Sequence, residues 1–305
     1  MARFVVRRVL WLLLVLLIIS LVTFLLMHLV PGGPWARAKP LPPAVIAAID
    51  AKYGLNKPLY VQYAKFLWGI LHGDLGISYS YQDRSVTQII MQSFPKSAIL
   101  GGIAFILALI VGISFGMAAA LRQNTWVDYV CVMFSTIFAS VPAFVLGILL
   151  VIVFSVILHW LPSGGWGKPS DIILPAIALA ALPAAYIARI ARASTLETMR
   201  QDYVRTARSK GLKERVVLVR HILRNALIPV VTISGPEFAA LITGSFIVES
   251  IFSIPGIGRL FVSSVFARDY GLIMGTTLFY AFIISIANLV VDILYAVIDP
   301  RIRYD

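Results

Sequence analysis

Six long apolar runs constrain this chain more than any other feature of its sequence. They cover roughly residues 9–30, 97–121, 130–158, 172–191, 227–251 and 272–298. A helix needs about 20 mainly apolar residues to cross the roughly 30 Å hydrocarbon core, where lipid offers the backbone no hydrogen-bond partner. The composition agrees, since 60% of the 305 residues are hydrophobic and only 13% are charged. We therefore predict an all-α integral membrane protein with six transmembrane helices.

The first apolar run could instead belong to a signal peptide. Arg3, Arg7 and Arg8 supply a basic segment before it, and residues 36–38 resemble a cleavage site. However, the apolar core of a signal peptide runs about 7 to 15 residues, whereas 9–30 is long enough to cross the bilayer. We therefore predict that this run is a retained first span.

Lysine and arginine residues predict the orientation, because short loops that carry them stay on the cytoplasmic side. If the chain starts inside, 16 of its 26 basic residues fall in inner segments, ten of them between Arg189 and Arg224. Seven more lie in the long segment 31–96, which leaves only Lys168, Arg259 and Arg268 in short outer loops. Both termini are thus predicted to be cytoplasmic. Topology and anionic lipid headgroups account for the net charge of +12 without any nucleic acid.

The segment 31–96 is patterned like a set of short helices. Pro43 and Gly54 bracket one helix, and Pro58 opens a second over 59–71. Ser85 and Gln88 have the spacing of a capping box before a third. The segment is interpreted either as a packed cap on the membrane surface or as a rim that receives a soluble partner.

The sequence holds no motif for enzymatic chemistry. Nucleophile elbows, paired metal-binding histidines and phosphate-binding loops are all missing, and Pro169 stands where a phosphate loop needs serine or threonine after Lys168. The four histidines lack ligand spacing, and the lone Cys131 allows neither a disulfide nor a thiol metal site. We expect no catalytic residue, metal or cofactor in this chain, so that any ATP is bound by another chain.

Small residues predict how the spans pack. Ala104, Ala108, Gly112, Gly116 and Ala120 recur every four residues, so they form a ridge on which another helix can approach closely. This helix is expected to be central. The fourth span is alanine-rich and contains two prolines that are expected to bend it.

Two acidic residues fall inside predicted spans. Glu237 lies in the fifth span and Asp292 in the sixth, where an ionised carboxylate costs at least about 2.5 kcal/mol unless it is paired or wetted. Both are candidates to line a pathway or to pair with a neighbouring subunit. For Asp292, a bond to nearby hydroxyls or a place near the inner interface is an equal alternative.

A basic segment over residues 193–226 interrupts the apolar pattern. Ser194 and Glu197 fit a capping box, so a helix is expected to begin there and to end at Gly211, with Leu212 closing back on Ala207. The expected apolar stripe of this helix is Leu196, Met199, Tyr203 and Ala207. A second helix is expected from residue 213 until Pro229. A bare cytoplasmic loop needs neither caps nor a stripe, so we predict a docking elbow for a cytoplasmic partner.

At this point the residues resemble a known family. The segment RTARSKGLKERVVLVRHILRNALIPVVT, residues 205–232, is similar to the cytoplasmic loop motif of permease subunits of ATP-binding-cassette importers, in its peptide-permease form. Five other blocks agree in order along almost the whole chain: LVPGGP, HGDLGISY, GSFIVESIFSIPGIGRLF, ARDY and VDILYAVIDPRIRY. The motif is not complete, since Arg205 and Thr206 replace its glutamate and first alanine, while Ala207 and Gly211 keep its second alanine and its glycine.

The resemblance implies a type I importer permease fold in a bacterial inner membrane. Its parts would be the N-terminal tail and first span (1–30), an extracytoplasmic helical loop (31–96), a five-helix core (97–298) and a cytoplasmic C-terminus (299–305). The implied partners are a second homologous permease, two cytoplasmic ATPases that bind ATP and magnesium, and an extracytoplasmic binding protein. The ATPase-docking candidates are Leu196, Met199, Tyr203, Arg205, Thr206, Ala207, Gly211 and Leu212. The candidates to face the binding protein are Glu249, Pro255, Gly256, Gly258 and Arg259.

Import of oligopeptides or dipeptides is the implied activity, and three alternatives remain beside it. The same family also imports nickel and other small solutes. An ion-coupled secondary transporter could use Asp292 and Glu237 as carriers, although no inverted repeat is evident between the halves. A membrane-embedded hydrolase would need a clustered nucleophile and base, which the sequence does not supply.

Overall fold

The computed structural model describes the chain except for residues 1, 32, 36–41, 82–83 and 299–305, and it leaves undescribed the side chains of 2–5, 43 and 291–298. Every named element among the described residues is a helix, and one isolated bridge joins Ile77 and Ser85. The helices in chain order are α1 (Ala2–Leu29), α2 (Pro43–Tyr53), α3 (Leu59–Leu71), α4 (Val86–Leu121), α5 (Trp126–Ser140), α6 (Ala143–Leu150), the π-helix η1 (Val151–Ile157), α7 (Ser170–Met199), α8 (Asp202–Ser209), α9 (Glu214–Val216), the π-helix η2 (Val217–Leu223), α10 (Arg224–Ile242), α11 (Phe246–Ile251), α12 (Ile257–Phe266) and α13 (Tyr270–Ile298).

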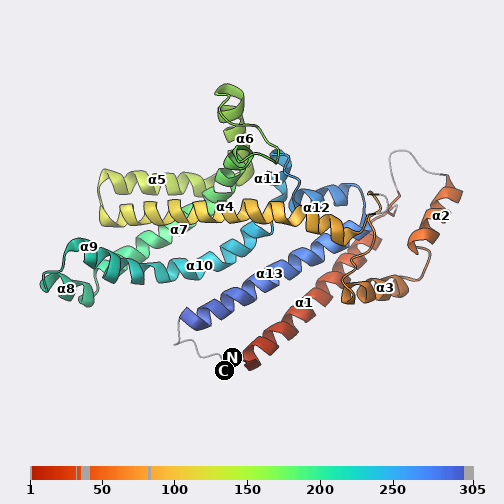
Figure 1. Cartoon of the computed structure of the whole chain (residues 1–305), viewed down its shortest axis with the longest axis horizontal. Coiled ribbons are helices and arrows are strands. Elements are labelled where there is room, and N and C mark those ends of the chain that lie inside the picture. The colour runs from red at the N-terminus through yellow and green to blue at the C-terminus, as the bar shows by residue number, and fades with distance from the viewer. Residues whose placement is uncertain (1, 32, 36–41, 82–83, 299–305) are drawn as a thin grey trace.

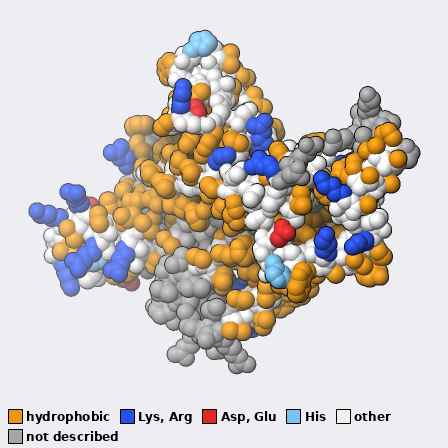
Figure 2. All heavy atoms as spheres, turned by 45° about the vertical axis from the view of Figure 1, so that its right-hand side comes forward, with side chains coloured by type: hydrophobic (Ala, Val, Ile, Leu, Met, Phe, Trp, Pro, Cys, Tyr) orange, Lys and Arg blue, Asp and Glu red, His pale blue; other side chains and the backbone are white. Residues whose placement is uncertain are grey.

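Three long helices, α4, α7 and α10, form the centre of the bundle, and α13 and α1 lie beside them (Figure 1). Short helices lie at both ends, and α6 projects from the side of the bundle (Figure 1). We call the end that carries α8 and α9 the elbow end, and the end that carries α2, α3 and α12 the loop end. Hydrophobic side chains cover the middle of the molecule, and Lys and Arg side chains gather toward these ends (Figure 2). This distribution suits a bundle whose sides face lipid.

Five of the described helices are long and apolar enough to cross a membrane, and α5 with α6–η1 makes a sixth candidate. That pair corrects the expected third span at 130–158, because it is bent by 104° between Ser140 and Ala143. The physical cause is Pro142, which lacks an N–H and holds Val141 in the extended conformation (ψ 119°). The pair is therefore either a broken span or a re-entrant segment, and not one straight helix.

The second span also differs from the expectation. α4 begins at Val86 and runs without interruption to Leu121, so the third helix expected after Ser85 is its first part. Pro95 lies inside it. Ser85 occupies the N-cap position, but its side chain makes no capping hydrogen bond. The loop at this end is consequently shorter than predicted, whereas α2 and α3 have the predicted bounds to within a residue.

The ridge of small residues on α4 is buried, as predicted. Ala104, Ala108, Gly112, Gly116 and Ala120 all lie among the buried residues of this helix. A Cβ atom added at Gly116 would come within 2.4 Å of the carbonyl oxygen of Ala188 on α7. The two backbones therefore touch along this ridge, which places α4 and α7 at the centre of the core.

Candidate coupling elbow and loop-end contacts

The elbow begins later than its sequence pattern indicates. α7 continues without a break to Met199, and Ser194 is buried within it, so the predicted helix start at Ser194 and Glu197 is wrong. A capping bond contributes only about 1 kcal/mol, and here α7 stays helical through this point, with Ser194, Thr195 and Thr198 buried on its packed face. The short helix of the elbow, α8, starts at Asp202 instead.

Gly211 ends the elbow's first helix in the predicted way. Its φ of +75° is left-handed, a conformation that glycine adopts without steric cost. The N–H of Gly211 donates to the carbonyl of Arg208 at 2.9 Å, and the N–H of Leu212 donates to that of Ala207 at 3.4 Å. The chain thereby reverses direction in a few residues and enters α9.

A small core holds the two arms of the elbow together. It consists of Val204 and Ala207 from α8 with Val217 and Ile222 from η2, and Met199 packs against it. The predicted stripe is thus only partly correct, because Tyr203 is 42% exposed and Leu196 lies outside this core. The Tyr203 hydroxyl instead accepts a hydrogen bond from Asn225 at 3.0 Å. Val204 was missed, although its spacing of three from Ala207 fits a buried helix face.

The outer surface of the elbow is apolar at its centre and basic around it. Leu212, just before α9, is 41% exposed, and Val216 of α9 and Val219 of η2 are 39% and 54% exposed. Arg205 and Thr206 are exposed beside them. Arg208 forms an ion pair with Glu214 at 2.6 Å, which links the two arms across Gly211. Val216 and Val219 had not been recognised as surface residues, although their spacing from Leu212 was visible in the sequence.

The second arm does not stop at Pro229. η2 leads directly into α10, which contains both Pro229 and Pro236 and continues to Ile242. Neighbouring helices and local π-helical turns allow a proline within a membrane helix. The elbow is therefore joined to a helix of the central bundle with no loop between them, so a movement at α9 can pass into α10.

At the loop end, Glu249 is a buried anchor. Its carboxylate accepts from the Ser97 hydroxyl of α4 at 2.7 Å and from the backbone N–H of Arg259 at 3.0 Å. Gly256 and Gly258 are buried against it, since an added Cβ would lie 2.4 Å and 3.0 Å from its Oε2 atom. These three residues therefore do not face a partner, contrary to prediction, while Pro255 and Arg259 are exposed and remain candidates.

A second buried carboxylate ties the loop to the core. Asp269 is fully buried and accepts from the Ser78 hydroxyl and from the backbone N–H groups of Tyr79 and Ser80 at 3.0 and 2.9 Å. It also accepts from the N–H of Leu272 in the first turn of α13. Burial, and then this carboxylate, raise the pKa of Tyr79. The sequence blocks HGDLGISY and ARDY thus meet at one point.

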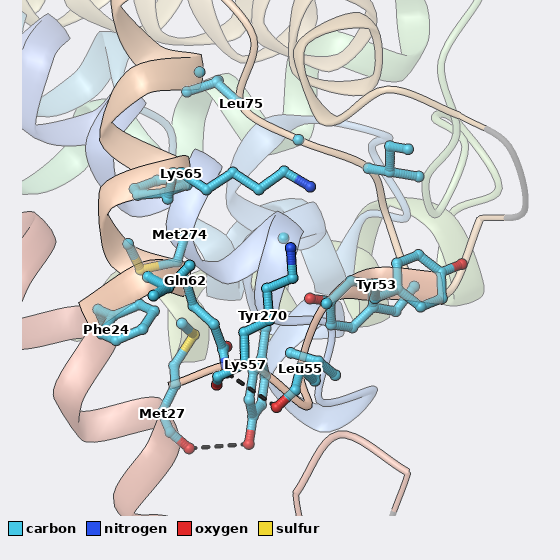
Figure 3. Close-up of a pocket in the computed structure, with 18 of the residues that line it drawn as sticks. Phe24, Met27, Tyr53, Leu55, Lys57, Gln62, Lys65, Leu75, Tyr270 and Met274 are labelled. Atoms are coloured by element: carbon cyan, nitrogen blue, oxygen red, sulfur yellow. Dashed lines mark hydrogen bonds between the residues drawn. The ribbon is translucent and has the colours of Figure 1, made fainter. Parts of the chain in front are cut away.

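A cavity of about 270 Å³ lies beside this contact, between α1, α3 and the start of α13. Its walls include Phe24, Tyr53 and Tyr270, and the side chains of Lys57 and Lys65 extend into it (Figure 3). The Tyr270 hydroxyl donates to the carbonyl of Met27 at 3.0 Å. This hydrogen bond joins α1 to α13 where the cavity meets the bundle.

The two acidic residues predicted to line a pathway are Glu237 and Asp292. Glu237 lies half-buried on α10 and has no polar partner among the described residues. The side chain of Asp292 lies outside the described residues. A further acidic residue was missed: Asp128, in the first turn of α5, accepts two hydrogen bonds from Arg192 of α7, at 2.8 and 2.7 Å. Only the tertiary structure brings this pair together, since 64 positions separate its members.

Two family models together match nearly the entire chain. Residues 112–304 match the binding-protein-dependent transport system inner membrane component, and residues 1–101 match the N-terminal part of such membrane components. The chain belongs to this family. As a family member it is a multi-pass membrane component of a transport system, which agrees with the apolar spans.

Curated relatives cover the chain from end to end. The oligopeptide transport system permease protein OppB of Escherichia coli K12 is 45% identical over 306 residues, which cover 100% of both chains. The dipeptide transport system permease protein DppB of Bacillus subtilis 168 is 41% identical over 303 residues, covering 99% of this chain and 98% of that protein. The family member is thus similar to permeases along its full length, loops and spans alike.

Solved structures support the fold. A chain of the MetNI methionine ABC transporter aligns with a TM-score of 0.57 at 16% identity, covering 70% of this family member and 97% of that chain. An amino acid ABC transporter aligns with a TM-score of 0.51 at 18% identity, covering 71% and 95%. The type I importer permease fold is therefore confirmed.

Proposed function

We propose that this chain is a permease subunit of an ATP-driven, binding-protein-dependent importer of oligopeptides or dipeptides. The observation that carries the proposal is the full-length similarity to an oligopeptide and a dipeptide permease, at 45% and 41% identity. A second, homologous permease would complete the translocation pathway. In this scheme ATP and magnesium bind only to two partner ATPases, and the permeases alternate between inward-open and outward-open states.

The elbow is the proposed docking site for an ATPase on the cytoplasmic side. Its centre is Leu212, Val216 and Val219, whose exposed apolar surface suits a cleft in another protein. The remaining members of the proposed site are those predicted from the sequence. Arg205, Thr206 and Gly211 lie at the surface of the elbow, and the residues that hold its shape are Leu196, Met199, Tyr203 and Ala207. Because η2 continues into α10, closure of the ATPases would move this central helix.

The loop end is the proposed contact for the extracytoplasmic binding protein. Pro255 and Arg259 supply exposed groups there. Glu249 positions both of them from inside, because its carboxylate holds the first turn of α12 against α4. With this orientation the elbow end and both termini would lie in the cytoplasm of a bacterium, which is what the distribution of basic residues predicts.

The pathway itself is proposed to run beside α10. Glu237 is the candidate on this helix, since an intramembrane carboxylate without a partner in the described chain needs water, substrate or a second subunit. A peptide's ammonium group is a suitable counter-charge. Asp292 stays a second candidate. Replacement of either residue by its amide is expected to lower uptake; unchanged transport and assembly would remove that residue from the pathway.

The composition of the complex is tested by purification from the native membrane in mild detergent. The proposal expects a homologous permease and cassette ATPases to co-purify, and the accompanying binding protein to bind peptide rather than nickel. A binding protein that takes nickel would move the assignment to a metal importer of the same family. A chain that purifies alone and transports with an ion gradient would overturn the proposal.

The coupling role is tested by the Gly211→Pro substitution. Proline requires φ near −65° and has no N–H, so it removes both the left-handed turn and the bond to Arg208. We expect the assembled transporter to hydrolyse ATP with far less peptide taken up per ATP. The matched control is Gly54→Pro, because Gly54 has nearly the same φ (+73°) but lies at the loop end. If the Gly211→Pro variant takes up the normal amount of peptide per ATP hydrolysed, the coupling role of the elbow is refuted.

A further inference from the structure

Helix α3 has an apolar face that no described residue covers. Tyr60, Ala64, Trp68 and Leu71 follow one another at spacings of four, four and three, which places them on one side of the helix. Tyr60, Trp68 and Leu71 are 76%, 66% and 78% exposed. A soluble protein rarely leaves such a stripe open to water.

A second, aromatic face of α3 packs on the first span. Tyr63 and Phe66 contact the cluster that Phe24 and Met27 of α1 form with α13. The Tyr63 hydroxyl lies 2.8 Å from the Ser20 hydroxyl of α1, and its ring lies 5.2 Å from that of Phe24. Apolar side chains thus cover most of the helix surface, as expected for a helix that lies in a protein core or in a membrane.

The contact with α1 sets the depth of α3. The apolar span of α1 ends at Leu29, and Ser20 lies nine residues before it. At 1.5 Å per residue, the Tyr63 hydroxyl therefore reaches α1 about 13 Å from the end of the span, whereas the neighbouring Gln62 lies 3.3 Å from His28, next to that end. The beginning of α3 thus lies at the loop end of the first span, and the Tyr63 side chain reaches from it along the part of α1 that lipid surrounds.

Lys65, the one charged residue of α3, lies away from the exposed apolar stripe. Lys65 extends into the cavity behind the helix, where Lys57 also points (Figure 3). Gln62 lies at the same cavity and donates to the carbonyl oxygens of Leu55 and Lys57. The polar groups of this helix are therefore directed toward the cavity, as expected for a charged side chain next to hydrocarbon.

We propose that α3 is inserted into the leaflet at the loop end and that its open stripe contacts lipid acyl chains. Lipid is the occupant because the stripe continues a surface that already faces it: Leu21 and Leu25 flank the Ser20 and Phe24 contact on α1 and are 42% and 45% exposed. Trp68, near the end of α3, suits the interface between chains and headgroups. The loop end is then anchored in the bilayer beside the cavity, and α3 is not a surface for a soluble partner.

Spin labels on the assembled transporter test this proposal. In a Cys131→Ser background, Tyr60→Cys, Trp68→Cys and Leu71→Cys each carry one nitroxide, so the failure of one variant leaves the others. The transporter is reconstituted in vesicles of phosphatidylethanolamine and phosphatidylglycerol. Power saturation then compares collisions with oxygen, which concentrates in lipid, with those of a water-soluble nickel chelate. Leu25→Cys on α1 is the lipid control, and Asn56→Cys, exposed in the loop before α3, is the aqueous control.

The proposal expects each label on α3 to collide more often with oxygen than with the nickel chelate. The logarithm of the oxygen-to-nickel accessibility ratio should then have the same sign as for the Leu25 label and the opposite sign to the Asn56 label. Higher nickel accessibility would place the stripe in water and overturn the proposal. Low accessibility to both reagents would mean that another protein chain covers the stripe, and this result overturns it as well.

Discussion

Two adjacent glycines of α4 allow a matched test of how closely the central helices pack. A Cβ added at Gly101 would lie 2.1 Å from the carbonyl oxygen of Leu241 on α10, and 2.5 Å from its carbonyl carbon. A Cβ added at Gly102 would meet nothing within 4 Å. The two positions share one helix and nearly one membrane depth, so they differ chiefly in this contact.

The magnitude follows from the atoms that must move. The Gly101→Ala methyl group meets backbone rather than a flexible side chain, so α4 and α10 must separate by about 1 Å, which forfeits a quarter to a half of each nearby dispersion contact. Overpacking of this kind costs about 1 to 3 kcal/mol, and we expect the upper end. Both variants gain up to about 1 kcal/mol of helix propensity. This gain cancels in their difference, which is therefore about 3 kcal/mol.

The assay heats the assembled transporter in mild detergent and measures the fraction of this chain that remains monodisperse. With about 2 to 4 °C per kcal/mol for a chain of this size class, Gly101→Ala should lose roughly 6 to 12 °C relative to Gly102→Ala. Equal midpoints for the two variants, or a lower midpoint for Gly102→Ala, would refute the inferred backbone contact between α4 and α10.

Two further predictions concern buried carboxylates. Asp269→Ala leaves the Ser78 hydroxyl and two backbone N–H groups without their acceptor, so limited proteolysis should cut the loop between α1 and α4 faster. The control is Asp171→Ala, which removes the acceptor of a solvent-exposed hydrogen bond from the Lys168 N–H. Equal cleavage rates for the two variants would contradict the role of Asp269 as an anchor of this loop. Asp128→Ala should lower the stability of the fold by about 2 kcal/mol, which is less than the roughly 3 to 5 kcal/mol for breaking a fully buried pair, because Arg192 is 29% exposed. In the same heating assay, adding Arg192→Ala should restore part of the lost stability. No recovery in the double variant would argue against the ion pair.

Local patterns predicted much of this structure. Pro58 and the apolar residues after it predicted α3 with the bounds that it has, because proline at a helix start and periodicity act within one helix. The glycine turn at Gly211 was predicted for the same reason, since its cost depends on its own φ. The predicted helix start at Ser194 was wrong, because a capping hydrogen bond contributes only about 1 kcal/mol and a whole helix face is buried around this residue.

Contacts between distant segments could not be predicted in this way. The family resemblance implied that Glu249 faces a binding protein, yet its carboxylate accepts a hydrogen bond from Ser97, 152 positions away. Nothing in the sequence near either residue indicates that pairing. The same is true of Asp128 with Arg192, and of Asp269 with Ser78.

The membrane location, the approximate spans, the small-residue ridge and the glycine turn were determined by the sequence alone, because each depends on residue types at fixed spacing along one helix. The tertiary structure decided which side chains are available to partners. It buried Glu249, exposed Val216 and Val219 on the elbow, and set α3 against the first span. These outcomes depend on which helices meet and at what distance, and those distances are set by packing over the whole bundle.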